Sequence, residues 1–159
     1  MKYQSFTGIG KRENNEDVIL IEKFSQEVEL YLVVDGMGGY EKGEVSARLV
    51  AENISTHLRT VEIINKTEIN NAIKKANLAV KQFNESNKIA SGATVAGIVF
   101  KLDIALCFWL GDVQIYHFLN GNLDWQSKGH RFDSDIQLQD CFDNPISPDR
   151  EVGFNVSIF

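Results

Sequence analysis

Two aspartates occupy the ends of a predicted pair of strands. Residues 18–24 and 28–34 are short, β-branched and apolar, and the three residues between them have the length of a hairpin loop. If the residues that flank this loop face each other, Asp17 lies opposite Asp35. Facing side chains in an antiparallel pair have Cβ atoms about 4.5–5.5 Å apart. Two carboxylates so placed repel each other unless a cation lies between them, and a hard divalent cation fits such oxygen ligands.

The neighbouring residues favour the same chemistry. Glu16 adds a third carboxylate, and the glycines of the segment 35–39 allow a sharp bend that exposes backbone carbonyls. Arg12 supplies a planar guanidinium that suits a phosphate oxyanion. The alternatives are an ordinary Asp-Gly turn at Asp35 and a surface ion pair between Arg12 and Glu13 or Glu16.

Asp112 resembles Asp35 in its position, because it follows Gly111 where another apolar strand ends. Taken alone, it also fits a simple turn. His57 is expected in a helix and His117 in a strand, each in ordinary packing or at the surface, whereas His130 is expected in a loop. No order of serine, cysteine, histidine and aspartate indicates a catalytic triad, and no phosphate-binding P-loop is present.

Two helices and several further strands must position these groups. Residues 41–60 and 67–86 have the apolar spacing of helices, and Thr67 is a candidate N-cap of the second. The expected buried stripes are Ala47, Val50, Ala51, Ile54 and Leu58 in the first helix and Ile69, Ala72, Ile73, Ala76, Val80 and Phe83 in the second. Strands are predicted at residues 93–100, 103–109, 113–119 and 122–126.

The ends and turns of the chain complete the pattern. Residues 1–7 could form an edge strand, and Asn120-Gly121 predicts a two-residue hairpin turn. From residue 127 onward the acidic sequence with both prolines is typical of loops, although the last six residues could form a strand. Strands, two helices and then more strands indicate an α+β fold with an antiparallel sheet or sandwich.

Composition excludes several classes of protein. The 159 residues suit one domain, and 16 basic against 22 acidic side chains leave a net charge of −6. No cationic cluster exceeds a pair, which argues against a nucleic-acid partner. No apolar run is long enough for a membrane span, no secretion signal is visible, and two isolated cysteines fit a reduced cytoplasmic protein.

Four motifs in order carry a resemblance to a known family. Residues 10–17, GKRENNED, resemble the R-x-x-N-E-D signature of the bacterial metal-dependent protein phosphatases, the type 2C serine/threonine phosphatases. Residues 33–39, VVDGMGG, resemble their D-G-M-G-G segment. Residues 92–95, GATV, are similar to their G-A-T strand, and residues 111–116, GDVQIY, to G-D-S-R-x-Y. The resemblance covers residues 1–130 of a single domain, 1–159, whose remainder, 131–159, is a divergent acidic loop and tail.

The resemblance implies an antiparallel β-sandwich flanked by helices, incomplete at the C-terminus, and two Mn²⁺ or Mg²⁺ ions. It implies that Asp35, the Gly36 carbonyl, Glu16 and Asp17 hold metal, directly or through water. Asp112 would belong to a weaker third metal site, and Arg12 would bind the substrate phosphate. The implied activity is hydrolysis of phosphoserine and phosphothreonine in proteins by a metal-activated water, with Arg12 and Asp35 as catalytic residues.

Departures from the family pattern leave an alternative open. The chain has no S-D-G motif, Asp143-Asn144 is followed by Pro145, and Gly129-His130-Arg131 replaces the family's D-H-S. The second metal site is therefore expected to be incomplete, and the chain could be a catalytically impaired module that binds a phosphoprotein or regulates a partner. A third possibility is an acidic domain whose Asp-Gly segments are only turns. Unpaired strand edges also predict self-association or marginal stability.

Overall fold

The computed structural model describes residues 3–9, 14–37, 42–102 and 104–129, together with the backbone of residues 142–145 and 151–155. The elements along the chain are β1 (Asp17–Lys23), β2 (Val28–Met37), α1 (Gly43–Thr60), α2 (Lys66–Asn87), β3 (Gly92–Lys101), β4 (Ile104–Leu110), β5 (Gln114–Leu119), β6 (Asn122–Gln126), β7 (Phe142–Pro145) and β8 (Glu151–Asn155). None of the described helices is long and apolar enough to cross a bilayer.

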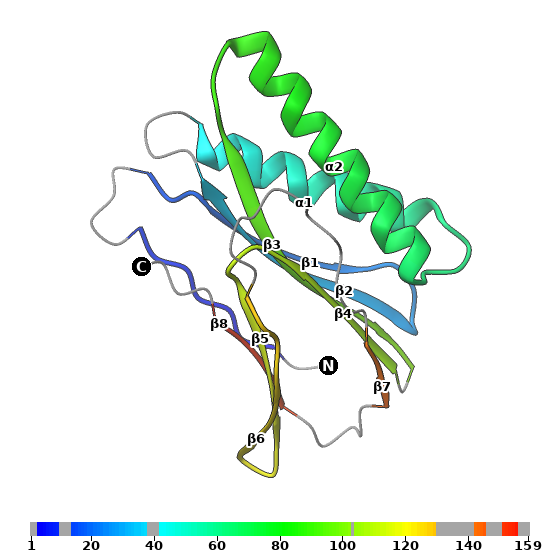
Figure 1. Cartoon of the computed structure of the whole chain (residues 1–159). Helices are drawn as coiled ribbons and strands as arrows, with labels where there is room; N and C mark the ends of the chain where they lie inside the picture. The colour runs from blue at the N-terminus through cyan, green and yellow to red at the C-terminus, as the bar shows by residue number, and fades with distance from the viewer. Residues whose placement is uncertain are drawn as a thin grey trace.

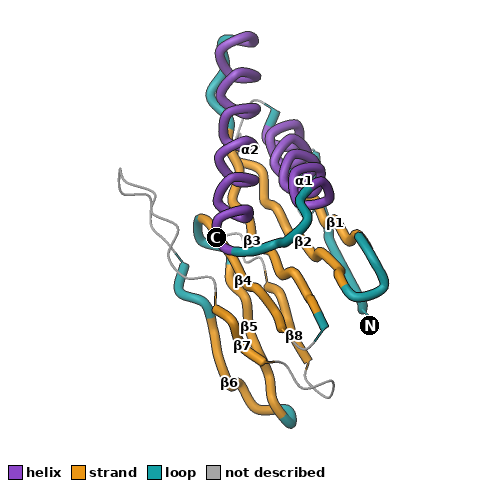
Figure 2. The backbone as a smooth tube through the Cα atoms, turned by 90° about the vertical axis from the view of Figure 1, so that its right-hand side faces the viewer, coloured by secondary structure: helices purple, strands orange, loops and turns teal. Residues whose placement is uncertain are grey.

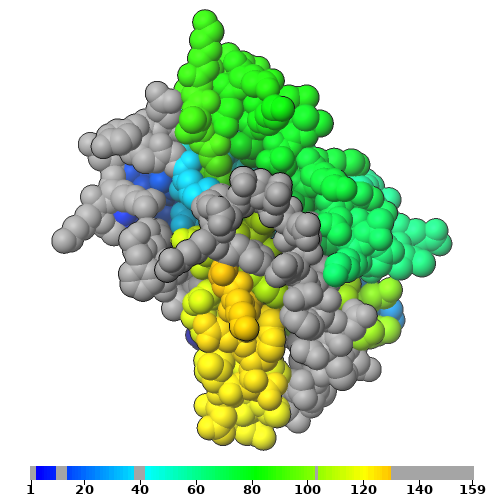
Figure 3. All heavy atoms as spheres, in the orientation of Figure 1, coloured from blue at the N-terminus to red at the C-terminus, as the bar shows by residue number. Residues whose placement is uncertain are grey.

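The described strands form two antiparallel sheets. One sheet has the strand order β1-β2-β3-β4-β7, and the other has the order β6-β5-β8. Figure 1 shows α1 and α2 lying across the first sheet, and Figure 2 shows the same layers from the side. In the space-filling view of Figure 3, the hairpin of β5 and β6, in yellow, projects away from the green helical layer. The predicted α+β class with antiparallel sheets is confirmed.

Two hydrophobic clusters lie on opposite faces of the first sheet. The larger cluster joins the sheet to both helices through the predicted stripes, which are buried except for the half-buried Phe83. The smaller cluster lies between the first sheet and β5, and includes Ile98, Trp109 and Ile115. Trp109 on β4 meets Trp125 on β6 edge-on, with ring centroids 5.8 Å apart. The first sheet is therefore covered by helices on one side and by the second sheet on the other.

Polar contacts fasten α1 to the strand that carries Asp17. Glu22 of β1 accepts a hydrogen bond from the hydroxyl of Ser55 and forms an ion pair with Arg59, both on α1. At the other end of the helix, Ser46 and Ser91 share a hydrogen bond of 2.6 Å between their hydroxyls. Because Ser91 immediately precedes β3, this bond relates the start of α1 to the start of that strand.

The boundaries of the elements differ from prediction at the start of α2. Asn65, and not Thr67, is the N-cap: its Oδ1 accepts a hydrogen bond of 3.0 Å from the backbone N–H of Glu68. Both residue types can cap a helix, so the pattern alone does not distinguish them. The turn at Asn120-Gly121 is as predicted, because Asn120 has φ 52° and Gly121 has φ 77°.

The two ends of the described chain were predicted wrongly in part. Residues 3–9 form no strand, and Phe6 is 91% exposed. Within the acidic tail that resembled a loop, residues 142–145 and 151–155 are strands that pair with β4 and β5. Pro145 is compatible with β7 because this strand lies at the edge of its sheet.

Candidate active site

Asp17 and Asp35 lie directly opposite each other at one end of the β1–β2 pair. The register runs to this pair from Lys23 opposite Glu29, so the pairing predicted from the loop length is confirmed. Val34, next to Asp35, is fully buried in the cluster under the helices. Because successive strand side chains alternate between the two faces, both aspartates lie on the face opposite the helices.

The carboxylate of Asp17 is held by two residues that precede β1. Thr7 Oγ1 donates a hydrogen bond of 3.2 Å to Asp17 Oδ2, and Asn15 Nδ2 donates one of 3.0 Å to Thr7 Oγ1. The side-chain oxygen of Asn15 accepts from the backbone N–H of Asp17 at 3.1 Å. Asp17 Oδ1 is buried and accepts no hydrogen bond within the described part of the chain.

Gly36 brings three backbone segments together beside the aspartates. Its N–H donates a hydrogen bond of 3.0 Å to the carbonyl oxygen of Glu16. A Cβ atom at Gly36 would lie 2.5 Å from the carbonyl carbon of Gly43 and 2.8 Å from the Glu16 oxygen. Since these are backbone atoms, only glycine allows the end of β2 to pass between the start of β1 and the first residue of α1.

A threonine extends the row of polar side chains on the same face of the sheet. Thr94 of β3 is paired with Asp35, and its side chain is 1% exposed. Among the described residues Thr94 Oγ1 has no hydrogen-bond partner. Gly111 has φ 97°, and a Cβ there would lie 2.5 Å from Thr94 Cγ2. The absent side chain at Gly111 therefore lets the chain leave β4 over Thr94, and the exposed Asp112 follows.

The structure brings together part of the predicted site. Four of its members meet at one end of β1 and β2, namely Glu16, Asp17, Asp35 and Gly36. Asp112 lies beyond the end of β4, two strands from Asp35. Arg12 and His130 fall outside the described residues. His57 and His117 are neither free nor near this site, because each pairs with a carboxylate of its own neighbourhood.

The donor set fits a hard cation, although it is small. Paired carboxylates and a buried carboxylate oxygen of Asp17 without a hydrogen bond are what Mg²⁺ or Mn²⁺ would need. Leaving such an oxygen buried and unsatisfied costs free energy, which a bound cation would offset. No three His, Cys, Asp or Glu side chains within the described ranges converge on one point. The described residues therefore fit one cation at the two aspartates and do not complete a two-metal site.

Farther along β2, an aromatic and acidic pair shares the face of Asp35. Tyr31 Oη donates a hydrogen bond of 2.7 Å to Glu29 Oε2. This bond lowers the pKa of Glu29, and burial raises the pKa of Tyr31. The ring of Tyr31 also packs edge-on against Phe100 and Tyr3. Glu29 thus remains ionised at neutral pH but is engaged, so it is no candidate ligand.

The helical side of the sheet carries an apolar groove of about 560 Å³. Its lining includes Val50, Val80 and Val95, which belong to the cluster under the helices. The groove therefore lies on the opposite face of the sheet from the two aspartates.

A comparison with protein families decides the classification. The family model described as protein phosphatase 2C matches residues 8–136. The chain belongs to this family. The match includes the two paired aspartates, Gly36, Thr94 and Asp112. A search of curated protein sequences found no match.

Solved phosphatase structures share the fold of this phosphatase 2C chain. The serine/threonine phosphatase PstP/Ppp of Mycobacterium tuberculosis has a TM-score of 0.60 and 28% identity, with 70% of this chain and 47% of that chain covered. A PstP catalytic domain in complex with two manganese ions has a TM-score of 0.60 and 25% identity, with 70% of this chain and 48% of that chain covered. Stp1 of Staphylococcus aureus has a TM-score of 0.66 and 23% identity, with 75% of this chain and 50% of that chain covered. This likeness shows the fold alone. The chain spans about half the length of these phosphatases.

Three supporting residues of the candidate site were not singled out as site residues from the sequence. Asn15 belongs to the first motif, and its position two residues before Asp17 is the signal for the turn that it forms. Thr7 carries no such signal, because its contact with Asp17 spans ten residues of irregular chain. Thr94 lies within a matched motif, but its place beside Asp35 depends on the pairing of β2 with β3.

Proposed function

We propose that this phosphatase 2C chain binds Mn²⁺ or Mg²⁺ at Asp17 and Asp35 and hydrolyses phosphoserine and phosphothreonine esters in proteins. The observation that carries the proposal is the direct pairing of these two aspartates, with a buried oxygen of Asp17 lacking a hydrogen bond among the described residues. The manganese complex of the PstP catalytic domain supports the choice of metal.

Each residue has a stated part in this proposal. Asp17 and Asp35 bind the cation, and Thr7 holds the carboxylate of Asp17 in place. Gly36 keeps the end of β2 close to Glu16, and its carbonyl and Glu16 are further candidate ligands. Arg12 binds the substrate phosphate, and Asp112 serves an additional metal position. When bound, the cation supplies Lewis acidity that makes water a nucleophile near neutral pH and offsets charge on the phosphate.

Hydrolysis of p-nitrophenyl phosphate with added Mn²⁺ tests the proposal. We expect the wild-type chain to be active and Asp35→Asn to lose at least about 100-fold, which is the scale of about 2.7 kcal/mol in the barrier. Glu52→Gln is the matched control, because Glu52 is an exposed carboxylate on α1. Activity that survives Asp35→Asn would contradict the assignment.

A second candidate function is a phosphatase-like module that binds without catalysis. It is favoured by the small donor set, since no three ligating side chains converge among the described residues. Calorimetric titration with Mn²⁺ separates the two functions. Binding that requires Asp35, in a chain without hydrolytic activity, indicates the module. Absence of both binding and activity would leave only the fold.

Other features of the proposal concern partners and environment. The partner is a phosphorylated protein, and the chain acts as one domain in the cytoplasm. Self-association is supported by apolar side chains that residues 3–9 leave exposed, with Phe6 at 91% and Tyr3 at 59%. Light scattering at increasing concentration should show a mass above that of the monomer. A single monomeric species with a high melting temperature would argue against self-association.

A further inference from the structure

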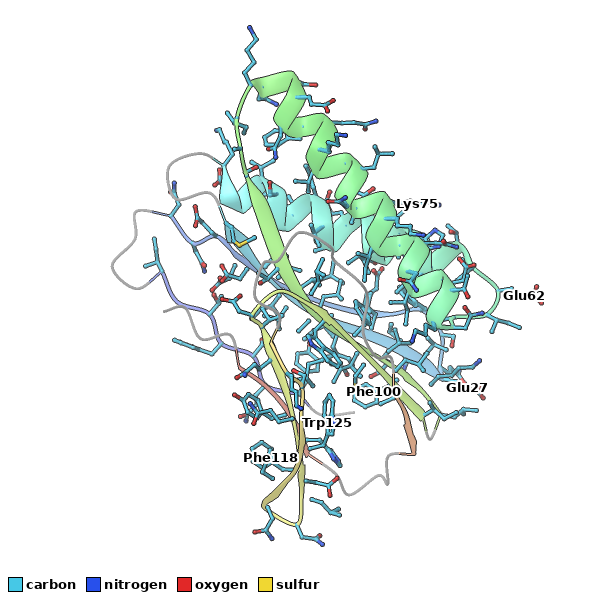
Figure 4. The ribbon with its side chains drawn as sticks, in the orientation of Figure 1. Glu27, Glu62, Lys75, Phe100, Phe118 and Trp125 are labelled. Carbon is cyan, nitrogen blue, oxygen red and sulfur yellow. The ribbon has the colours of Figure 1, made fainter. Side chains whose placement is uncertain are left out.

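Three side chains form a hydrogen-bonded row where α2 packs on α1, away from the aspartates. His57 Nε2 of α1 lies 2.7 Å from Glu68 Oε2 in the first turn of α2. His57 Nδ1 lies 2.8 Å from Lys75 Nζ, two turns farther along α2. In Figure 4 the labelled Lys75 extends from α2 on the outer side of the helical layer. The order along the row is carboxylate, imidazole and amine.

The contacts determine which ring nitrogen of His57 carries its proton. A lysine ammonium has donors and no acceptor, so Lys75 donates to Nδ1. Nδ1 therefore accepts, and the hydrogen of the neutral ring resides on Nε2, from which it is donated to Glu68. The imidazole is thus held with a lone pair directed at the lysine nitrogen.

Glu68 is itself held in place. Its backbone N–H donates to Asn65 Oδ1 at 3.0 Å, and its other carboxylate oxygen accepts from Asn71 Nδ2 at 3.4 Å. The side chain of His57 is only 9% exposed, while Lys75 is exposed. The base is therefore shielded and oriented, and the amine at the end of the row is accessible to a reagent.

This order is the one that activates a nucleophile, namely a nucleophile beside a base that a carboxylate orients. We infer that Lys75 is a preferred site of acylation by activated acyl donors, either acyl phosphates or thioesters. Acylation of Lys75 is independent of the phosphatase site, which lies on the other face of the first sheet, and it requires no metal ion.

The chemical step balances without any further reactant. The Lys75 ammonium passes one proton to His57 Nδ1, and Glu68 stabilises the imidazolium that forms. The nitrogen lone pair attacks the acyl carbon, an amide C–N bond forms, and the C–O bond to phosphate or the C–S bond to the thiol breaks. The leaving group departs with the electron pair and takes the second amine proton. His57 then returns its proton to solvent.

Lys74 provides an internal comparison on the same helix. It is exposed like its neighbour Lys75, and no hydrogen bond or ion pair is found for it among the described residues. A reagent that reacts by accessibility alone would modify the two lysines equally. A reagent that depends on the neighbouring imidazole would prefer Lys75.

The experiment incubates the full chain with acetyl phosphate, and in a second arm with acetyl coenzyme A, and follows both lysines by fragment-resolved mass spectrometry. We expect the initial rate at Lys75 to exceed that at Lys74 at least fivefold in one arm or both, and the arm identifies the donor class. A rate at Lys75 that is less than fivefold above the rate at Lys74 in both arms would overturn the inference.

A variant separates the role of the base from accessibility. In His57→Gln the amide NH2 can still donate to Glu68, but the amide oxygen is not a base that can take a proton from Lys75, so the rate at Lys75 should fall to that at Lys74. Circular dichroism verifies that the variant retains its helices. A preference unchanged in the folded variant would overturn the role of His57, and the wild-type comparison stands even if the variant fails to fold.

Discussion

Replacing Gly36 by alanine tests the close backbone contact of Gly36 with Gly43 and Glu16 beside the aspartates. The added Cβ would meet the carbonyl groups of Gly43 and Glu16, at 2.5 Å from the Gly43 carbon and 2.8 Å from the Glu16 oxygen. Neither neighbour can rotate away, because both atoms belong to the backbone. The start of α1, the entry to β1, or the end of β2 must move instead.

The magnitude follows from the cost of overpacking. Forcing extra atoms into a packed site costs about 1–3 kcal/mol, and a clash with backbone belongs at the upper end. For a chain of this size, about 3 kcal/mol corresponds to a melting temperature lower by about 6–12 °C. Movement at this point also separates Asp35 from Asp17, so Mn²⁺ affinity should fall together with stability.

Two glycines of the neighbouring strand β3 serve as graded controls. At Gly97 a Cβ would lie 2.6 Å from Phe108 Cε1 and 2.7 Å from Leu32 Cδ2, which are side-chain atoms that can shift in part. At Gly92 the nearest atom is the flexible end of Met37, at 3.4 Å. Thermal and urea unfolding should rank the alanine variants with Gly36 the least stable, Gly97 next and Gly92 near wild type. A Gly36→Ala chain as stable as Gly92→Ala would refute the reasoning.

Three further predictions have defined outcomes. Thr94→Val removes a buried hydroxyl that has no hydrogen-bond partner among the described residues, so urea unfolding should show unchanged or higher stability, by up to about 1 kcal/mol; a loss of more than that would reveal a bond. Tyr31→Phe removes the hydrogen bond to Glu29, and should cost about 1–2 kcal/mol at pH 7. The pKa of Glu29 is lowered in the folded chain, so this stabilisation is present above the ordinary pKa of 4.5 and is lost as pH falls through the lower folded value. The free energies of unfolding of the wild type and Tyr31→Phe should therefore converge in acid. Asn65→Ala should cost about 1 kcal/mol of stability because the N-cap of α2 is lost, whereas Thr67→Ala should cost much less. The reverse order would indicate that Thr67 is the N-cap, as the sequence predicted.

Local patterns predicted much of the first sheet and the helical layer. The β1–β2 register followed from a short loop between two apolar runs, because slipping by one residue would turn Val34 out of the core and Asp35 into it. The helical stripes followed from spacing alone. The Asn120-Gly121 turn followed from the residues that tolerate positive φ.

Non-local pairing explains what could not be predicted. Residues 142–145 and 151–155 are strands because β4 and β5 offer edges to them, and not because their own sequence favours strand. Conversely, residues 1–7 were a candidate edge strand, but residues 3–9 form no strand and pair with none in the described chain. Thr94 enters the site only through its register with Asp35, a relation across 59 positions that no local motif contains.

The edge-on pair of Trp109 and Trp125 provides an optical reporter. These are the two tryptophans of the chain, and each belongs to a different sheet. Trp109 Nε1 also donates a hydrogen bond of 2.8 Å to the Lys128 carbonyl, beyond the end of β6. Indole emission and the near-ultraviolet dichroic signal therefore report the docking of one sheet on the other, while far-ultraviolet ellipticity follows mainly the helices. Recording both during unfolding distinguishes a chain that comes apart in one step from one that releases its hairpin first.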